Sequence, residues 1–289
     1  MKKIAVCFLS AVLLVLSFQP VHAEDQRVLA IIDSAVDSSK IPQIIYEACF
    51  TSVSKTISCP NKTSFMEGKG SASAVKWPTS IQDAVYHGQN VAQSALAINS
   101  NLKIVFIRVA DIDQSTGNTA GSQPISIINA MKWVSDNATK YSIDAVSISV
   151  SSITASNISL CTTNTLLISS VASLNNQNVP VFAATGNDKS LDKVGFPACT
   201  SGVIGVGAFI PTLGVLETAT NRGPGIDVVA QNAITIPNVK ATGFFDFTAT
   251  SAATPIAASL YVKQTTYATV DLFISSFAKV LNKYPYISR

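Results

Sequence analysis

Short, unbroken runs of apolar residues recur along this chain of 289 residues. They do not alternate with polar residues, so each run predicts a strand that is covered on both faces. Segments with helical spacing separate several of the runs and would supply that cover. We therefore expect an α/β fold, with a doubly wound, mostly parallel sheet flanked by helices in three layers. The predicted strands are 27–33, 103–111, 143–150, 179–185, 202–208 and 226–230, and the predicted helices are 88–98, 126–140 and 165–177.

The first 23 residues have a composition of their own. Lys2 and Lys3 precede an uncharged apolar run, 4–18, and a small residue, Ala23, follows it. This pattern is typical of a secretory signal peptide, and the run is short for a membrane-spanning helix, which needs about 20 apolar residues. The alternative is an uncleaved anchor. We expect residues 1–23 to be removed and residues 24–289 to form a single secreted or periplasmic domain.

Removal of that segment takes away Cys7 and leaves Cys49, Cys59, Cys161 and Cys199. An even count in an exported chain indicates disulfides, and four cysteines allow three pairings. Proximity in the sequence favours Cys49–Cys59 and Cys161–Cys199. Only one histidine would remain to join the cysteines, so we expect no metal site and no cofactor.

The charge of the predicted mature chain is almost balanced. The full chain has a formal net charge of +3, and the loss of Lys2 and Lys3 lowers this to +1. Such a chain has no electrostatic basis for binding nucleic acid or an anionic membrane. We expect neither as a partner, and we expect a monomer.

Four polar residues stand where predicted strands end or helices begin. Asp33 ends the first strand, His87 lies at the start of a helix, and Asn187 follows a later strand. Ser251 precedes Pro255, and proline is typical of the first turn of a helix. Each of these residues has an ordinary alternative role as a cap or turn residue. Their joint placement indicates one active site, because the carboxyl ends of parallel strands meet at one edge of a sheet.

The segments around these residues resemble, in order, the conserved blocks of the subtilisin-like serine peptidases, the subtilases. The resemblance covers nearly all of residues 27–289. It implies that Ser251 is the nucleophile, His87 the general base and Asp33 the group that orients His87. It also implies that Asn187 donates to the oxyanion and that the substrate is a polypeptide. The segments are VLAIIDSAVD, YHGQNVAQSALA, VPVFAATGND, VGFPACTSGVIGVGA, NRGPGIDVVA and TATSAATPIAASL.

The same resemblance places a substrate cleft. Ser149, Val150 and Ser151 correspond to the family strand that pairs with the substrate backbone. The family usually has two glycines where this chain has Ser151 and Ser152, whose side chains should crowd the subsites on the acyl side. Gly195 corresponds to the floor of the primary specificity pocket. A glycine there predicts a preference for large apolar P1 side chains.

Several positions depart from the family blocks without removing a triad group. Ala35 stands where the family keeps a residue that is free to take a positive φ angle. Gln89 and Asn90 replace a threonine and a histidine, and Ala249 replaces the glycine before the nucleophile segment. Such changes can shift the geometry, and about 1 Å of misplacement can lower a rate 100-fold.

Two family features are expected to be absent. Only residues 24–32 separate the predicted cleavage site from Asp33, so no propeptide fits there. A separate inhibitor or chaperone protein would then have to replace it. The calcium-binding loop of the family's histidine helix is also missing, so we expect no calcium at that position.

The main alternative function is a pseudopeptidase, a catalytically weak or inactive binding protein with the subtilase fold. An esterase is disfavoured because the chain has no Gly-x-Ser-x-Gly segment. A nucleotide-binding loop is disfavoured because GKGSAS, residues 68–73, lacks the P-loop spacing.

Overall fold

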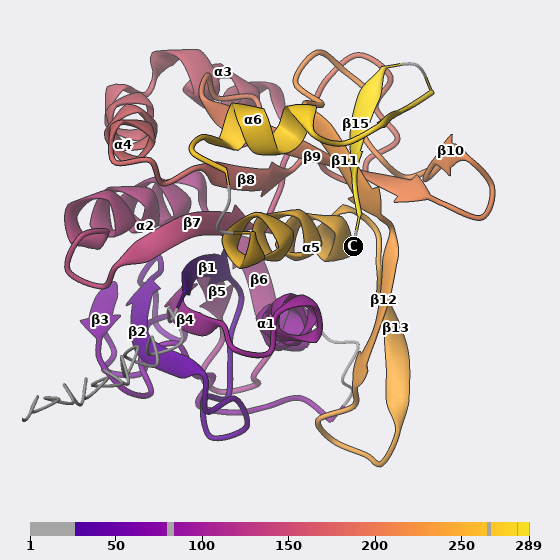
Figure 1. Ribbon diagram of the computed structural model, residues 1–289. Coiled ribbons are helices and arrows are strands. Elements are labelled where there is room, and N and C mark those ends of the chain that lie inside the picture. Colours follow the sequence, from indigo (N-terminus) through magenta and orange to yellow (C-terminus); the bar gives the residue numbers. More distant parts are fainter. Residues whose placement is uncertain (1–26, 80–83, 265–266, 282, 289) are drawn as a thin grey trace, which may run out of the picture.

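The computed structural model describes residues 27–79, 84–264, 267–281 and 283–288 (Figure 1). The predicted signal peptide, 1–23, lies outside the described residues. An eleven-stranded sheet runs through the molecule. Its strands are β1 (Val28–Asp33), β2 (Ile44–Phe50), β3 (Phe65–Glu67), β4 (Lys103–Arg108), β7 (Ile143–Ile148), β8 (Val181–Ala184), β9 (Val203–Ile210), β10 (Val215–Leu216), β11 (Val228–Gln231), β14 (Lys279–Val280) and β15 (Tyr284–Ile287).

The strand order is β14-β15-β11-β9-β8-β7-β1-β4-β2-β3, and β10 pairs with β9. All pairings from β15 to β2 are parallel, whereas β3, β10 and β14 pair antiparallel. β1 lies between β4 and β7, so the chain winds outward from it in both directions. Ligand sites of such sheets lie at the carboxyl ends of the strands where the winding reverses. That rule points to Asp33, the last residue of β1.

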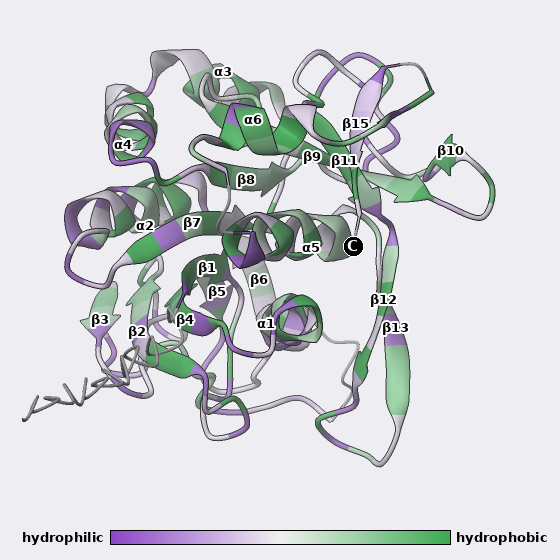
Figure 2. Cartoon of the chain, viewed as in Figure 1, coloured by the Kyte–Doolittle hydropathy of each residue, from purple (hydrophilic) through white to green (hydrophobic). Residues whose placement is uncertain are grey.

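Helices cover both faces of the sheet (Figure 1). Apolar residues of α1 and α5 pack on one face, and apolar residues of α2 and α4 pack on the other. Figure 2 shows the central strands and α5 mostly in green, as expected for elements buried between layers. The predicted three-layer α/β fold is therefore confirmed. The helices are α1 (His87–Ile98), α2 (Pro124–Asn137), α3 (Ala155–Thr163), α4 (Thr165–Asn176), α5 (Thr250–Lys263) and α6 (Val270–Ser275), with a 3₁₀ turn at Ala84–Tyr86.

Two small antiparallel sheets lie outside the main one. β5 (Ala110–Ile112) pairs with β6 (Thr119–Ser122), and β12 (Ala233–Pro237) pairs with β13 (Phe244–Thr248). The β12–β13 hairpin ends directly before α5 and packs beside α1 (Figure 1). It therefore links the two helices that carry His87 and Ser251.

Pro255 lies inside α5, in its second turn, and not in the first turn as the sequence suggested. Proline has no N–H group, so the carbonyl four residues earlier, that of Ser251, loses its helical partner. The Ser149 hydroxyl, just after β7, donates to this carbonyl at 3.1 Å. The proline thus frees a backbone oxygen that ties the start of α5 to the end of β7.

Two disulfides are present, and they join the pairs that proximity in the sequence favours. Cys49–Cys59 links β2 to the loop that follows it, with Cα atoms 5.9 Å apart. Cys161–Cys199 links α3 to the segment after β8, with Cα atoms 5.7 Å apart. The second bridge crosses 38 residues and holds the 195–199 segment against α3.

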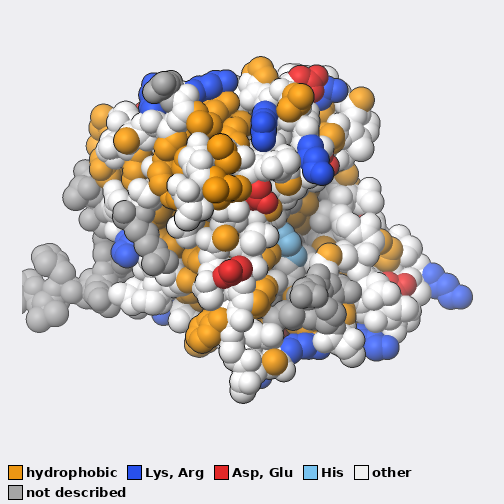
Figure 3. Space-filling model, turned by 90° about the vertical axis from the view of Figure 1, so that its right-hand side faces the viewer, with side chains coloured by type: hydrophobic (Ala, Val, Ile, Leu, Met, Phe, Trp, Pro, Cys, Tyr) orange, Lys and Arg blue, Asp and Glu red, His pale blue; other side chains and the backbone are white. Residues whose placement is uncertain are grey.

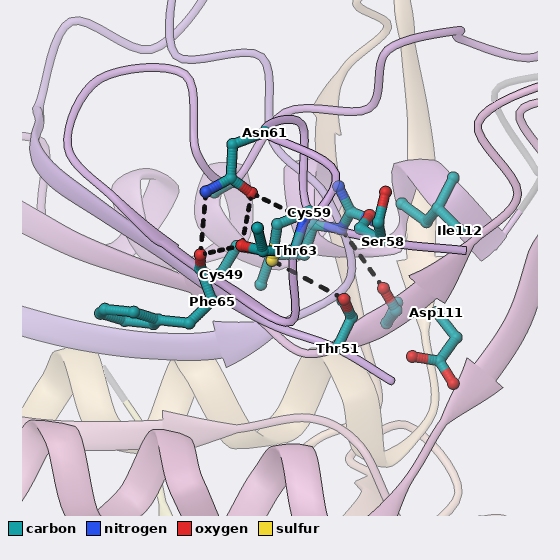
Figure 4. The surroundings of a disulfide bond; sticks show 12 residues. Cys49, Thr51, Ser58, Cys59, Asn61, Thr63, Phe65, Asp111 and Ile112 are labelled. Carbon is teal, nitrogen blue, oxygen red and sulfur yellow. Dashed lines mark hydrogen bonds between the residues drawn. A yellow bond between two sulfur atoms is a disulfide. The ribbon is translucent and has the colours of Figure 1, made fainter. Parts of the chain in front are cut away.

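The Cys49–Cys59 loop is further held by polar contacts (Figure 4). Asn61 and Thr63 both donate to the Phe65 carbonyl, at 3.0 and 2.6 Å. The fully buried Arg108 side chain donates to three backbone carbonyls, those of Ser58, Ser73 and Ala110. Burial lowers the pKa of Arg108 to about 10, against the opposing effect of the Asp111 charge. The guanidinium therefore fastens this loop to the strand beside β1.

We expect loss of the Cys161–Cys199 bridge to lower the free energy of unfolding by about 2–4 kcal/mol, because the 38-residue interval would no longer be closed in the unfolded chain. The measurement is urea unfolding of the Cys161→Ala/Cys199→Ala double variant beside the oxidised wild-type protein. Equal unfolding free energies would contradict this expectation.

Candidate active site

Asp33, His87 and Ser251 come from three segments far apart in the sequence and meet at one edge of the sheet. Asp33 is the last residue of β1 and is fully buried. His87 is the first residue of α1, and Ser251 is the second residue of α5. α1 packs against both β1 and α5, which brings the three residues to the same place.

The start of α1 approaches β1 closely. The Gly88 N–H donates to the Ser34 hydroxyl at 2.7 Å, and that hydroxyl donates to the Val85 carbonyl at 3.0 Å. A Cβ atom on Gly88 would lie 2.7 Å from the Phe106 ring and 2.8 Å from the Ala35 carbonyl oxygen. Only glycine fits this contact, and the contact sets the position of His87.

His87 forms a short hydrogen bond with Asp33, with 2.7 Å between Nδ1 and Oδ1. The Asp33 carboxylate accepts this bond, so Nδ1 carries the proton and Nε2 is left as the free ring nitrogen. The side chain of His87 is 28% exposed, and its ring meets the edge of Phe247 at 5.3 Å. Burial lowers the pKa of His87, but the charge and the hydrogen bond of Asp33 outweigh it, so the pKa lies above its ordinary value of 6.5.

Ser251 is nearly buried at the start of α5. Its hydroxyl donates to the Ser149 carbonyl at 3.5 Å, and no hydrogen bond joins it to His87, both residues being among those the structure describes. A hydrogen bond from Ser251 to Nε2 of His87 therefore requires another rotamer of Ser251. Such bonds are often long or poorly aligned in a site that holds no substrate.

Ala249 precedes α5 with φ at 70° and ψ at −162°. This conformation favours glycine and costs about 1–3 kcal/mol for other residues. Its N–H donates to the Asn232 carbonyl at 2.7 Å, which holds the strained residue in place. An alanine in this conformation places strain two residues before Ser251.

Asn187 follows β8 and is oriented by Thr250. Its Oδ1 accepts hydrogen bonds from the Thr250 N–H at 3.2 Å and from the Thr250 hydroxyl at 2.8 Å. The Thr250 N–H can donate only to an oxygen, so these bonds determine which atom of the Asn187 amide is Oδ1 and which is Nδ2. The Nδ2 group of Asn187 therefore faces away from Thr250. This role of Thr250 was not predicted from the sequence, although the residue lies directly before Ser251.

A cleft of about 380 Å³ brings Asp33, His87 and Asn187 together, and the start of α5 reaches its lining through Thr250 and not through Ser251 (Figure 3). The picture shows a pale blue histidine side chain in a hollow near the middle of this face. Four predicted site regions contribute to the lining: the end of β1, the start of α1, the segment after β7 and the turn after β8. The lining residues include Asp33, His87, Ser149, Val150, Ser151 and Asn187.

Gly195 does not open onto this cleft. It is buried, and it is not among the described residues that line the cleft. A Cβ atom on Gly195 would lie 1.9 Å from the Ser151 hydroxyl oxygen. The space above Gly195, which the sequence analysis took as open, is thus filled by Ser151.

The part of the chain that the structure describes contains no group of three or more His, Cys, Asp or Glu side chains that could hold a metal ion. Within the same residues, no helix is both long and apolar enough to cross a membrane.

Comparison with known protein families gives one match that covers most of the chain. The model of the subtilase family, Peptidase_S8, matches residues 24–267. A curated relative, alkaline elastase YaB from Bacillus sp. (strain YaB), is 27% identical over 196 residues, which cover 66% of this chain and 48% of the relative. The chain thus spans about half the length of that relative.

Solved structures share the fold at low sequence identity. A protease from Pseudoalteromonas arctica has a TM-score of 0.67 at 16% identity, with 89% of this chain and 84% of that chain covered. The protease domain of PatA has a TM-score of 0.57 at 17% identity, with 82% and 78% covered. The prenylagaramide maturation protease PagA has a TM-score of 0.54 at 18% identity, with 81% and 73% covered.

We expect Ala249→Gly to raise the free energy of unfolding by about 1 kcal/mol or more, because glycine adopts this backbone conformation without strain. Urea unfolding of the variant beside the wild type measures the gain. Ala241→Gly is the control, because that exposed residue is not among those with a positive φ angle. An unchanged or lowered stability of Ala249→Gly would contradict the strain.

We expect the His87 ring to titrate above pH 6.5 in the folded protein and to titrate lower in Asp33→Asn, because the variant keeps the burial and removes the charge. The measurement is an NMR titration of the ring protons in a chain of residues 24–289, in which His87 is the only histidine. Equal midpoints in the two proteins would contradict the assignment of Asp33 as the partner.

Proposed function

This chain belongs to the subtilase family of serine peptidases, and from that membership we propose that it is a serine endopeptidase that cleaves polypeptides. The observation that carries the proposal is the 2.7 Å bond between His87 and the buried Asp33, in one cleft with Asn187 and beside the helix that begins at Thr250. Family membership supplies the reaction class, and the described geometry supports the roles proposed for Asp33, His87 and Asn187.

In the proposed mechanism, Ser251 Oγ attacks the scissile carbonyl carbon while Nε2 of His87 accepts its proton. Asp33 holds the ring in the required tautomer and stabilises the imidazolium that forms. Ser251 must first leave the Ser149 carbonyl and turn to His87. His87 then gives the proton to the leaving amine, and water releases the acyl group in a second step.

Asn187 and the start of α5 are proposed to stabilise the oxyanion. The Nδ2 group of Asn187 and the backbone N–H of Ser251 are the donors. The N–H groups of the first helical turn have no partner within the helix, and they carry the positive end of the helix dipole. Thr250 holds Asn187 in the required orientation from the side opposite its Nδ2 group.

The segment 149–151 is proposed to pair with the substrate backbone as an added strand. It follows β7 directly and lines the cleft. The predicted preference for large apolar P1 side chains rested on open space above Gly195. Because Ser151 occupies that space, the geometry gives the preference no support.

The surroundings of the enzyme are also proposals. We propose that residues 1–23 are removed on export and that residues 24–289 act as one monomeric domain without a cofactor. The two disulfides are consistent with an oxidising compartment. A separate inhibitor or chaperone protein is proposed as a partner.

A pseudopeptidase is the second candidate function. One observation favours it: the Ser251 hydroxyl is bonded to the Ser149 carbonyl and not to His87. The strained conformation of Ala249, two residues before Ser251, would also favour a pseudopeptidase if it held the Ser251 hydroxyl on the Ser149 carbonyl.

We expect a fluorophosphonate to label the wild-type protein once, because only an activated serine reacts with it, and to leave Ser251→Ala and His87→Ala unlabelled. Intact-mass spectrometry of the protein of residues 24–289 detects the adduct. Ser169→Ala is the control, since that exposed serine of α4 should leave labelling unchanged. A folded, oxidised wild-type protein that takes no label would favour the pseudopeptidase.

A further inference from the structure

We propose that Ser151 closes the primary specificity pocket, so that the enzyme accepts small P1 side chains, alanine, glycine or serine, and excludes large ones. This inference rests on the proposed peptidase function and names its substrate class. It replaces the prediction that was based on Gly195 alone.

The Ser151 hydroxyl fills the gap between two glycines. Its oxygen lies 1.9 Å from the position of a Cβ atom on Gly195 and 2.6 Å from the position of a Cβ atom on Gly186. Gly186 lines the cleft beside Asn187, whereas Gly195 is buried behind Ser151. A large P1 side chain that reached toward Gly195 would therefore have to displace this oxygen.

Backbone hydrogen bonds keep the gap from widening. Ser152 and Phe196 exchange two bonds, at 3.1 and 2.8 Å, and Gly195 donates to the Thr185 carbonyl at 2.8 Å. These bonds join the segments after β7 and β8 to the segment that carries Gly195. The Cys161–Cys199 bridge anchors that last segment to α3. Opening the gap by moving its walls would break several of these contacts at once.

The hydroxyl of Ser151 acts by volume and not by hydrogen bonding. Its oxygen is buried and has no hydrogen-bond partner among the described residues. A buried hydroxyl without a partner destabilises the folded state, so this side chain adds nothing to the stability of the loop through polar contacts. The neighbouring Ser152 differs, because its hydroxyl accepts a bond from Asn157 at 2.8 Å.

The test compares chromogenic tetrapeptides that differ only in an alanine or a phenylalanine at P1. We expect the wild-type protein to favour alanine. We expect Ser151→Gly to raise the ratio of kcat/KM for phenylalanine to kcat/KM for alanine by about 10-fold or more, since a pocket contact of this size discriminates by about 10- to 200-fold. Ser152→Gly is the matched control, because it adds a glycine one residue away and keeps the Ser151 hydroxyl.

A wild-type preference for phenylalanine, or equal P1 ratios in Ser151→Gly and Ser152→Gly, would overturn the proposal. If Ser151→Gly does not fold, Ser151→Ala also lacks the oxygen and serves in its place. If neither peptide is turned over, labelling rates with peptidyl phosphonates that carry a methyl or a benzyl P1 group give the same ratio. A protein labelled by no phosphonate at all fails as a peptidase, which is a different result from a labelled protein with an unaltered P1 ratio.

Discussion

The close approach of α1 to the end of β1 determines the geometry of the site. Gly88 permits it, since any Cβ there would collide with Phe106 and the Ala35 carbonyl, and the Ser34 hydroxyl fastens it by bonds on both sides. The 2.7 Å bond from His87 to Asp33 follows from this contact. A buried carboxylate beside an imidazole favours the charged ring, so the approach sets the protonation of His87 as well as its position.

The start of α5 is positioned by contacts of a different kind. Pro255 leaves the Ser251 carbonyl without its helical partner, and Ser149 takes it, so the helix is tied to β7 at the residue proposed as nucleophile. Ala249 holds a conformation that favours glycine immediately before this point. Two local rules are thus broken close to the proposed nucleophile, by a proline inside a helix and by an alanine at a positive φ angle, as is common at functional sites.

The sequence predicted the parts of the fold that follow from burial. Continuous apolar runs identified β1, β4, β7, β8, β9 and β11, because strands covered on both faces need no polar residue. The β12–β13 hairpin was not predicted, since only alternate residues of its strands are turned inward and the rest are exposed or half-buried, so it has no continuous buried apolar run. Blocks of family motifs pointed to Asp33, His87 and Asn187, which line the cleft, and also to Ser251 and Gly195, which are not among its lining residues. The orientation of Asn187 by Thr250 could not be predicted, because it depends on contacts between segments 63 residues apart.

The filling of the space above Gly195 shows why a motif residue does not define a pocket. A glycine leaves space only if no other side chain enters it, and Ser151 lies 44 positions earlier in the sequence. The groups proposed for chemistry are held by α1 and α5 against the sheet, whereas the space for a P1 side chain is bounded by loops after β7 and β8 and by the segment at Gly195. These are separate sets of contacts. A substitution at residue 151 can therefore change which P1 side chain is accepted without moving His87 or Asp33. A substitution at Gly88 is expected to move His87 and to leave the walls of the P1 pocket in place.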